Sequence, residues 1–347
     1  MLDYGFDVTL YERSTRIGGL FAYNGDDGDG LPSVMRNTII NTSKEMSAFS
    51  DFPAPKDLPN YMHNSEVASY FRSYADHFGV TPLVRTRHDV VQAKPAADYD
   101  ESGCWDVLVR DLDSNRERLE VFCAVCVCAG HHVFPNVPSF KGQERFRGRI
   151  IHTQSFRNAN KFRDRRVAVV GTGNSAMDVV AELSHVASKT TRLNDYLTRV
   201  LPSAVSENYF EEIMNDVFNH DTYGLKPKHR YSSQHRLVSD VLPSLIISGR
   251  VRVKKGIVEF TEDGILFDGD KEVTPLDDVI LATGYQVTYP FLPEDLAPVV
   301  GNRAQLYKYV FPPQLRHPTL AIMGLVQPGG AVFPVSEMQV RMSATPS

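Results

Sequence analysis

The sequence lacks several features that would assign it to a specialised class of protein. Its 347 residues contain no apolar run long enough to span a membrane. Its opening stretch MLDYGFDVTLYERS has neither the basic n-region nor the apolar h-region of a signal peptide. The formal net charge is −5, so no basic surface for nucleic acid is indicated. We therefore expect no nucleic-acid partner, no transmembrane segment in this chain and no signal peptide.

Cysteine is also scarce, with only Cys104, Cys123, Cys126 and Cys128. Three of the four lie in one apolar segment, which predicts reduced thiols rather than a disulfide framework. Cys123 and Cys126 have CxxC spacing, but a redox-active CxxC stands at the start of a helix. Because both lie in a strand-like run, we expect them to pack in the core.

Clusters that would bind a metal or form an acid–base pair are absent from the sequence pattern. The acidic loop Asn24–Gly30 is too irregular for a calcium loop. No metal site is predicted.

The composition is that of an ordinary globular protein, with 42% hydrophobic and 23% charged residues. The length predicts two domains, or one domain with a large insertion. Two amphipathic helices are expected, over Ser65–Phe78 and Ser206–His220. Strands are expected over Trp105–Arg110, Arg118–Gly130, Leu276–Tyr285 and Thr319–Leu325, and a meander of short strands over Arg250–Val253, Ile257–Phe260 and Gly264–Phe267.

The most informative stretch is RRVAVVGTGNSAMDVVAEL, residues Arg165–Leu183. Val167–Val170 is an all-apolar run typical of a buried parallel strand, and it leads through a GxGxxG/A turn into a helix. Gly171 permits the tight turn, and Gly173 lets the backbone approach a pyrophosphate. The first N–H groups of the helix then favour negative charge. This order predicts a dinucleotide site.

Two strands that should accompany such units are not evident. Asp7–Tyr11 reads as a strand with Glu12 at its end, where a ribose would be held, yet a preceding strand and GxGxxG turn would lie about 20 residues earlier. After the helix, a second apolar strand should follow, but Lys189–Asn194 is a poor strand.

Taken together, these segments resemble the flavin-containing monooxygenase family through most of the chain. The most specific match is Phe146-x-Gly148-x-x-x-His152-x-x-x-Phe156, the family's FxGxxxHxxxY/F signature. Baeyer–Villiger relatives carry Trp at the positions of Ile150 and Phe156, so the match favours the N- and S-oxygenating branch. Other matching segments are YERSTRIGGL, NTSKEM, DFP, YMHNS, CAGHHVFPNVP, YGLKPKHR, ISGRVRVK, VILATGY, YPFL and VFPPQL.

The resemblance implies a function that composition could not show. In this family NADPH reduces FAD, and the reduced flavin takes O₂ at C4a to give a hydroperoxide that oxidises nucleophilic nitrogen or sulfur centres of small molecules. The cofactor carries the chemistry, and the protein positions and shields it. The implied cofactors are FAD and NADP, and the implied partners are O₂ and a small-molecule nucleophile. Family resemblance also implies the cytoplasmic side of the endoplasmic reticulum membrane.

The resemblance also implies roles for individual residues. Glu12 would hold the FAD ribose, and the flavin would be lined by Gly18, Gly19, Leu20 and Phe21. Asn41 matches the active-site Asn, whose amide would act beside the flavin and hold NADP⁺ over it, with Ile40, Thr42, His63 and Asn64 in neighbouring segments. The NADP pyrophosphate would be held by Gly171, Gly173, Asn174, Ser175, Ala176, Met177 and Asp178. Thr283 and Gly284 would close a strand where the chain crosses between nucleotide domains.

The implied architecture is an α/β fold of two Rossmann-like dinucleotide-binding domains, in which the FAD domain lacks its first strand and glycine turn. The expected boundaries are residues 1–155 for the first part of the FAD domain, 156–279 for the inserted NADP domain and 280–347 for the return part.

The departures from the family point to an incomplete version of such an enzyme. The GxGxxG turn for FAD is absent, as is a segment near residues 189–191 with the Arg that reads the 2′-phosphate. The family's C-terminal part is absent beyond about residue 339, which leaves Val340–Ser347 as a weakly structured end. Three alternatives stay open: a catalytically inactive truncated product, a Baeyer–Villiger-type monooxygenase, and a disulfide reductase with a reactive CxxC.

Overall fold

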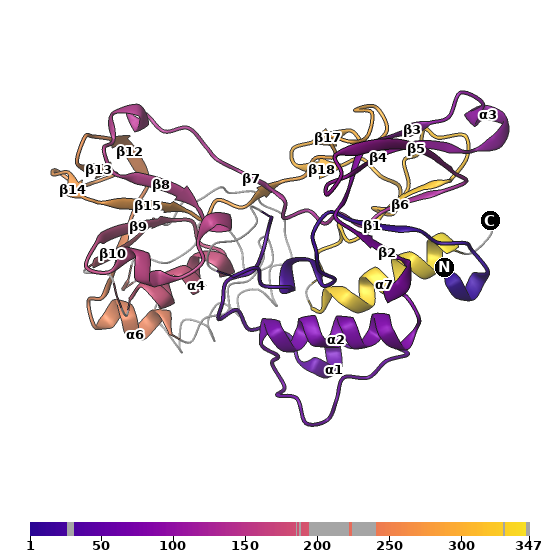
Figure 1. Cartoon of the computed structure of the whole chain (residues 1–347). Coiled ribbons are helices and arrows are strands. Elements are labelled where there is room, and N and C mark those ends of the chain that lie inside the picture. The colour runs from indigo at the N-terminus through magenta and orange to yellow at the C-terminus, as the bar shows by residue number, and fades with distance from the viewer. Residues whose placement is uncertain are drawn as a thin grey trace, which may run out of the picture. The chain divides into compact units, whose positions relative to one another are not determined.

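The structure, a computed structural model, describes residues 1–25, 31–184, 186, 189–193, 222–223, 241–328 and 330–344. The chain divides into two compact units (Figure 1). Unit 1 comprises Met1–Asn24, Gly28–Phe134 and Tyr285–Ser347, and unit 2 comprises Pro135–Gly284 with Gly25–Asp27. Unit 2 extends beyond the expected range of 156–279, because a strand near residue 150 pairs into its sheet. The helix expected over Ser206–His220 lies outside the described residues.

Unit 2 is built on a parallel five-stranded sheet with the order β11-β10-β9-β15-β8. In that order the strands are Val251–Lys254, Lys189–Leu193, Arg166–Val170, Asp278–Leu281 and Arg149–His152. Strands β9 and β15 are buried along nearly their whole length, as continuous apolar runs in a sheet covered on both faces should be. The central strand β9 is therefore hydrogen-bonded on both edges.

Two layers cover the faces of this sheet. Helices α4 (Asn174–Leu183) and α6 (Leu242–Ile247) pack against β9, β10 and β11. A meander of β12 (Ile257–Phe260), β13 (Gly264–Phe267) and β14 (Thr274–Pro275) shares an apolar core with β9 and β15. The apolar residues of the meander therefore complete a two-sided core around the parallel strands.

The structure corrects two expectations for unit 2. Residues 189–193 form strand β10, which pairs in parallel with β9 and β11, although their sequence is a poor strand pattern. Two partner strands supply a full set of backbone hydrogen bonds, which outweighs weak local propensity. Residues 251–254 are the edge strand β11 of the parallel sheet and not part of the meander.

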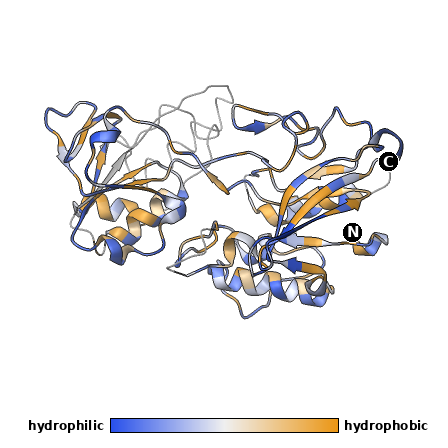
Figure 2. Ribbon diagram, turned by 45° about the horizontal axis from the view of Figure 1, so that its top comes forward, coloured by the Kyte–Doolittle hydropathy of each residue, from blue (hydrophilic) through white to orange (hydrophobic). Residues whose placement is uncertain are grey.

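Unit 1 contains an antiparallel sheet of β3 (His88–Pro95), β4 (Trp105–Asp111) and β5 (Arg116–Phe122). Figure 2 shows hydrophobic stretches along these strands. Trp105 is fully buried, and its indole Nε1 donates to Thr319 Oγ1 at 2.9 Å. The single strand expected over Arg118–Gly130 is interrupted. Cys123 and Ala124 have no strand conformation, and they separate β5 from the next strand.

The parallel strands of unit 1 form two separate pairs. Strand β1 (Leu10–Glu12) pairs with β2 (Val84–Thr86), and β6 (Val125–Val127) pairs with β19 (Leu320–Ile322). Tyr11 of β1 and the valines of β6 pack against one apolar core that includes Trp105. Among the described residues, β1 and β6 each pair along only one edge.

Three α-helices of unit 1 lie near one another: α1 (Lys44–Ser47), α2 (Asn64–His77) and α7 (Val332–Ala344). Phe333 of α7 meets Phe71 of α2 at 4.9 Å between ring centroids, and Phe49 contacts both rings. Helix α7 runs through residues 340–344, which were expected to be weakly structured. Its apolar residues Val340 and Met342 gain a packing surface at Ala321 and Met323, which the local sequence does not reveal.

The remaining short elements have the following bounds. They are α3 (Tyr99–Ser102), β7 (Phe134–Pro135), β16 (Tyr285–Gln286), β17 (Val299–Val300), β18 (Arg303–Ala304), and the 3₁₀ turns η1 (Leu2–Tyr4), η2 (Gly19–Phe21), η3 (Thr81–Leu83), η4 (Gln143–Arg145), η5 (Thr153–Ser155) and η6 (Ala159–Phe162).

Candidate nucleotide-binding and active-site residues

The glycine turn of unit 2 joins β9 to α4, and its two glycines serve different purposes. Gly171 has φ +135°, and a Cβ there would overlap the carbonyl oxygen of Ala282 at the end of β15. Gly173 has an ordinary φ of −77°, and no atom lies within 4 Å of the position its Cβ would occupy. Gly171 is therefore required by the fold itself, whereas Gly173 keeps a space open above the turn.

The start of α4 has the features of an anion site. Gly173 is the N-cap and has no side chain, so no side-chain cap occupies the first N–H groups of this ten-residue helix. Ala176 is fully buried, and Met177 is nearly so. Ser175 is exposed, and the buried Oδ1 of Asn174 has no hydrogen-bond partner among the described residues.

Asp178 lies one turn beyond Asn174, on the same side of α4. Burial disfavours its charged form and raises the pKa of its carboxyl to about 6. No cation of the described residues forms an ion pair with it. The carboxyl therefore stays sensitive to pH near neutrality. The start of α4 thus presents two polar groups, the Asn174 Oδ1 and the Asp178 carboxyl, that have no partner among the described residues.

Thr283 and Gly284 form the point where the chain leaves unit 2. Thr283 Oγ1 donates to the carbonyl of Asn136 at 2.5 Å, and the Gly284 carbonyl accepts from the Asn136 N–H at 2.9 Å. His152 Nε2 lies 3.0 Å from the same Gly284 carbonyl. Burial lowers the pKa of His152, so its neutral form is favoured as the donor.

The FxGxxxHxxxF signature is thus structural in this chain. A Cβ at Gly148 would overlap the Phe146 ring and the Asp277 carbonyl. Phe156 is 1% exposed and stacks on Phe162 at 5.5 Å. His152 anchors the exit from unit 2 as described above. The residues of this signature therefore help to hold the fold of unit 2.

In unit 1, the segment expected to line a flavin is a glycine turn followed by η2. Gly18 and Gly19 have φ of +124° and +53°. The Leu20 carbonyl accepts from the Val34 N–H at 2.9 Å. The Phe21 ring packs edge-on against Phe71 and Phe333. The two glycines allow the chain to turn sharply ahead of this aromatic cluster.

Two other predicted segments of unit 1 do come together. The Ile40 N–H donates to the Met62 carbonyl at 3.0 Å, and the Asn64 N–H donates to the Thr38 carbonyl at 2.9 Å. His63 is the N-cap of α2, in a capping box with Glu66. The structure therefore places the residues around Asn41 beside the start of α2.

Asn41 and Asn64 differ in what their amides do. Asn64 is 2% exposed, and its Nδ2 donates to the carbonyls of Met35 and Arg36 at 3.2 and 2.8 Å. Its amide is thus used within the protein. Asn41 is exposed, and its side chain shows no hydrogen bond to the described residues. Thr42 Oγ1 is paired with Ser47 Oγ at 2.7 Å. Of these residues, Asn41 has the amide that a ligand could use.

Lys44 is a buried residue that sequence reasoning missed. It is 7% exposed, and its Nζ donates to the carbonyls of Pro55, Lys56 and Leu58. A lysine bonded to three carbonyls fixes the loop of residues 55–58 against α1. The signal available in the sequence was its place in the NTSKEM match, directly after Asn41-Thr42-Ser43.

Glu12 ends β1, as expected, and its carboxylate is engaged locally. Its Oε1 accepts from the Ser14 N–H at 2.7 Å, which closes the turn that follows the strand. Oε2 has no hydrogen-bond partner among the described residues, so one carboxylate oxygen is left for a ribose hydroxyl.

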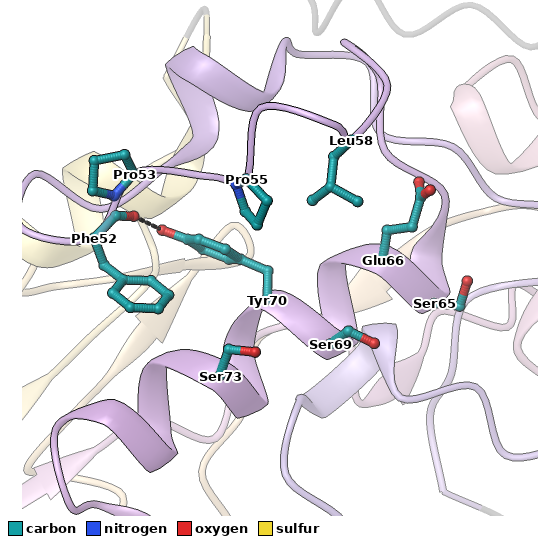
Figure 3. A pocket seen from close by; sticks show the side chains of 9 residues that line it. All are labelled: Phe52, Pro53, Pro55, Leu58, Ser65, Glu66, Ser69, Tyr70 and Ser73. Carbon is teal, nitrogen blue, oxygen red and sulfur yellow. Dashed lines mark hydrogen bonds between the residues drawn. The ribbon is translucent and has the colours of Figure 1, made fainter.

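A cavity of about 340 Å³ lies between α2 and the loop around residues 52–58 (Figure 3). Tyr70 OH, in its wall, donates to the Phe52 carbonyl at 2.6 Å. The other lining residues are Pro53, Pro55, Leu58, Ser65, Glu66, Ser69 and Ser73. None of the predicted site residues lines it, so we do not assign the nucleotide or substrate site to this cavity.

The four cysteines are free, and the expectation of core packing is wrong for Cys123 and Cys126, which are exposed. They lie beside the break between β5 and β6, where no described layer covers them. Among the described residues, no three His, Cys, Asp or Glu side chains are arranged to hold a metal ion. In the same part of the chain, no helix combines the length and apolarity needed to cross a bilayer.

The two units thus define an α/β protein of the Rossmann-type, two-nucleotide-domain class. Among solved structures, S-allyl-L-cysteine S-oxygenase from Allium sativum matches 99% of this chain and 72% of its own, with a TM-score of 0.74 and 23% identity. NADP⁺-bound cyclohexanone monooxygenase from Rhodococcus sp. Phi1 matches 99% of this chain and 79% of its own, with a TM-score of 0.70 and 17% identity. At these identities the likeness concerns the fold alone.

Sequence comparison is more specific. The flavin-binding monooxygenase-like family model matches residues 1–191 and 189–345. Flavin-containing monooxygenase 5 of Rattus norvegicus is 40% identical over 368 residues, which cover 98% of this chain and 68% of the relative. Dimethylaniline monooxygenase [N-oxide-forming] 2 of Cavia porcellus is 38% identical over the same shares. The chain belongs to the flavin-binding monooxygenase-like family, whose members are flavin-dependent monooxygenases.

The family match is divided at residues 189–191, where the sequence pattern predicts a missing segment. The family model matches in two pieces that meet there. The alignment with the rat relative is also longer than the 347 residues of this chain, so the relative has residues that this chain lacks.

Proposed function

We propose that this chain is an FAD- and NADPH-dependent monooxygenase that oxidises nucleophilic nitrogen or sulfur centres of small molecules, with O₂ as the second substrate. The observation that carries the proposal is the β9–glycine turn–α4 unit, open above Gly173, in a member of a flavin monooxygenase family. A relative named for N-oxide formation and a structural neighbour named as an S-oxygenase agree with this substrate class.

The residues of unit 2 fit an NADP pyrophosphate. The uncapped start of α4 offers backbone N–H groups and the positive end of the helix dipole. The unpartnered Oδ1 of Asn174 offers an acceptor for a hydroxyl. The 2′-phosphate calls for a cation near the end of the second strand, β10. Arg192 lies in β10, and Arg199 lies outside the described residues.

The residues of unit 1 fit FAD in part. Glu12 retains an oxygen for the ribose, and Gly18–Phe21 form a turn beside α2. The described residues of unit 1 contain no strand, glycine turn and helix that would hold the FAD pyrophosphate. When bound, the flavin would supply the activation of O₂ with electrons from NADPH. The proposal therefore rests more firmly on unit 2 than on unit 1.

Asn41 is the residue we propose to act at the reacting centre. Its amide is exposed, without a described hydrogen bond, and stands on a segment held by Met62 and by α1. An amide can donate and accept hydrogen bonds without releasing a proton at neutral pH. It would orient the nicotinamide and the oxygenating group while offering no acid that promotes loss of peroxide.

The test supplies FAD, NADPH and a thioether or N,N-dimethylaniline to the purified chain. Bound flavin is measured by its absorbance, and oxygenated product is compared with NADPH consumed. Asn41→Ala should keep NADPH oxidation but release hydrogen peroxide in place of product. Asn60→Ala, at another exposed asparagine of unit 1, should match the parent. Product formation by Asn41→Ala equal to that of the parent would contradict the role of Asn41.

A second candidate function is nucleotide binding without turnover, as expected of a catalytically inactive form. The separation of the parallel strands of unit 1 into β1–β2 and β6–β19 favours it, since a parallel sheet normally presents its nucleotide at a continuous strand edge. A version extended at its N-terminus by a strand–GxGxxG–helix segment distinguishes the two candidates. Flavin bound only by the extended version supports the second, whereas a flavin-loaded, active parent chain supports the first.

Reaction branch and location are also proposals. The residues at the two branch-determining positions, Ile150 and Phe156, favour heteroatom oxygenation over Baeyer–Villiger oxidation, which product analysis with a cyclic ketone tests directly. Family resemblance supports the cytoplasmic side of the endoplasmic reticulum, which cell fractionation would examine.

A further inference from the structure

Cys126 lies in the middle of strand β6, and Cys128 is the first residue after the strand. Val125 and Val127 pack toward the apolar core of unit 1, so Cys126 and Cys128, which alternate with them, point to the opposite face. Both cysteines are exposed. Their sulfur atoms lie 3.9 Å apart as a hydrogen-bonded thiol pair. The pair is therefore both preformed and accessible.

The two thiols are not equivalent. The hydrogen bond from the Cys126 thiol lowers the pKa of Cys128, because it stabilises the Cys128 thiolate. The same hydrogen bond raises the pKa of Cys126, because the Cys126 thiol gives its proton to the bond. Thiols that sense oxidants combine a lowered pKa, access to solvent and a neighbouring resolving cysteine. Cys128 has all three.

We propose that Cys126 and Cys128 form a peroxide-oxidisable dithiol, in which Cys128 attacks and Cys126 resolves. The Cys128 thiolate attacks one oxygen of hydrogen peroxide, forms a sulfenic acid and releases hydroxide, which is protonated to water. The Cys126 sulfur then attacks the Cys128 sulfur, and a second water leaves with the thiol proton. The sulfur pair loses two electrons, and the peroxide gains them.

The geometry further predicts that the disulfide is readily reversed. The sulfur atoms must approach from 3.9 Å to about 2.05 Å. In an extended strand, alternate Cα atoms are about 6.6–6.8 Å apart, at the upper limit for a disulfide. The bridge would therefore strain β6, and strained, exposed disulfides are reduced easily.

The other two cysteines provide a control within the same chain. Trp105 pairs with Phe122 across β4 and β5, so Cys104 and Cys123 are the next neighbours along that ladder. A hydrogen bond with Cys104 raises the pKa of Cys123. Cys123 should therefore react slowly, and the CxxC spacing of Cys123 and Cys126 does not correspond to the thiol pairs in the structure.

The experiment treats the reduced full chain with hydrogen peroxide at equal concentration, with and without dimedone, which traps sulfenic acids. Mass spectrometry follows the products. The parent should lose two hydrogen atoms within the peptide that contains Cys126 and Cys128, and dithiothreitol should restore them. Cys126→Ser should accumulate the dimedone adduct on Cys128. Cys128→Ser should be oxidised at least tenfold more slowly, while Cys104→Ser and Cys123→Ser should match the parent.

A second measurement does not depend on any variant. The parent is oxidised in urea, where all four thiols should react at similar rates, since the strand no longer holds the pair. A disulfide that forms instead between Cys104 and Cys123, equal rates for the parent and Cys128→Ser, or a Cys128 preference that persists in urea would each overturn the proposal.

Discussion

The two units use parallel strands in different ways. In unit 2, β9 lies inside a five-stranded sheet and is paired on both edges, and its end carries the glycine turn and α4. In unit 1, the parallel strands form two pairs, β1–β2 and β6–β19, over a shared apolar core. A nucleotide turn must be held rigidly from both sides, because its backbone N–H groups have to converge on one anion. Only unit 2 meets that requirement among the described residues.

The glycines of the two units differ in the same sense. Gly171 is pressed against Ala282 of the neighbouring strand, so its conformation is imposed by the sheet. Gly18 and Gly19 have positive φ, but a Cβ at Gly18 would make only ordinary contacts with Ala22 and Ala68, and no atom lies within 4 Å of a Cβ at Gly19. The turn of unit 2 is therefore part of the core, whereas that of unit 1 is a surface turn.

The largest expected effect comes from breaking the turn of unit 2. Gly171→Ala should lower the free energy of unfolding by about 3 kcal/mol or more, because the Cβ overlaps the Ala282 carbonyl and φ is unfavourable. Gly249→Ala, with φ +72° in open space, should cost only about 1 kcal/mol. Urea denaturation measures both variants, and similar losses would show that the contact with Ala282 is unimportant.

The second largest expected effect is a loss of stability in acid, which we attribute to an ion pair at the sheet of unit 2. The hydrogen bonds from Arg166 lower the pKa of the Asp277 carboxyl to about 2. A depressed carboxyl pKa stabilises the folded state above the unfolded pKa of about 3.9, and this stabilisation is lost as the pH falls from about 4 to 2. We expect a loss of about 2 kcal/mol, after allowing for partial exposure.

Asp277→Asn should remove most of that pH dependence, as followed by urea denaturation at several pH values. Asp268→Asn is the control, because Asp268 is exposed and has no ion pair among the described residues. If the free energy of unfolding of Asp277→Asn falls with pH as it does in the parent, the ion pair with Arg166 is not the cause of the acid sensitivity.

A smaller effect is expected on nucleotide affinity alone, from a substitution that leaves folding intact. Gly173→Val places a side chain in the open space above the turn, so NADPH affinity should fall at least tenfold, about 1.4 kcal/mol, while the chain still folds. Fluorescence titration with NADPH and NADH measures it. An NADPH affinity equal to that of the parent, in a folded variant, would mean that the pyrophosphate does not bind at this glycine turn. The family resemblance implies that an Arg-containing segment near residues 189–191 is missing, so we also expect the parent to prefer NADPH over NADH only weakly.

The smallest effect concerns Asp178. Burial raises its pKa to about 6, so the folded state binds this proton more tightly than the unfolded state does. Its ionisation therefore costs stability at pH 7, and stability should rise as the pH falls through 6 toward 4. Asp178→Asn should raise stability at pH 7 by about 1 kcal/mol and flatten this rise. Lower stability of the variant at pH 7 would reveal a charged partner for Asp178.

The sequence by itself determined the nucleotide unit, because strand, turn and helix are local patterns. The Arg165–Leu183 pattern correctly predicted β9, the glycine turn and α4, and the motif matches correctly predicted the family. The same motif matches identified Asn41 and His63 as candidate site residues, since both stand in matching segments. Their proposed roles remain predictions.

Only the tertiary structure decided the remaining features, because they depend on pairing between distant segments. Strand β10 forms because β9 and β11 flank it, although its own residues favour a strand poorly. His152 is an anchor because Gly284, 132 residues away, receives its hydrogen bond. Cys123, Cys126 and Cys128 are exposed, and Cys126 pairs with Cys128, because β6 has a partner along only one edge in the part of the chain that the structure describes. A local apolar pattern does not report which layers will cover a strand.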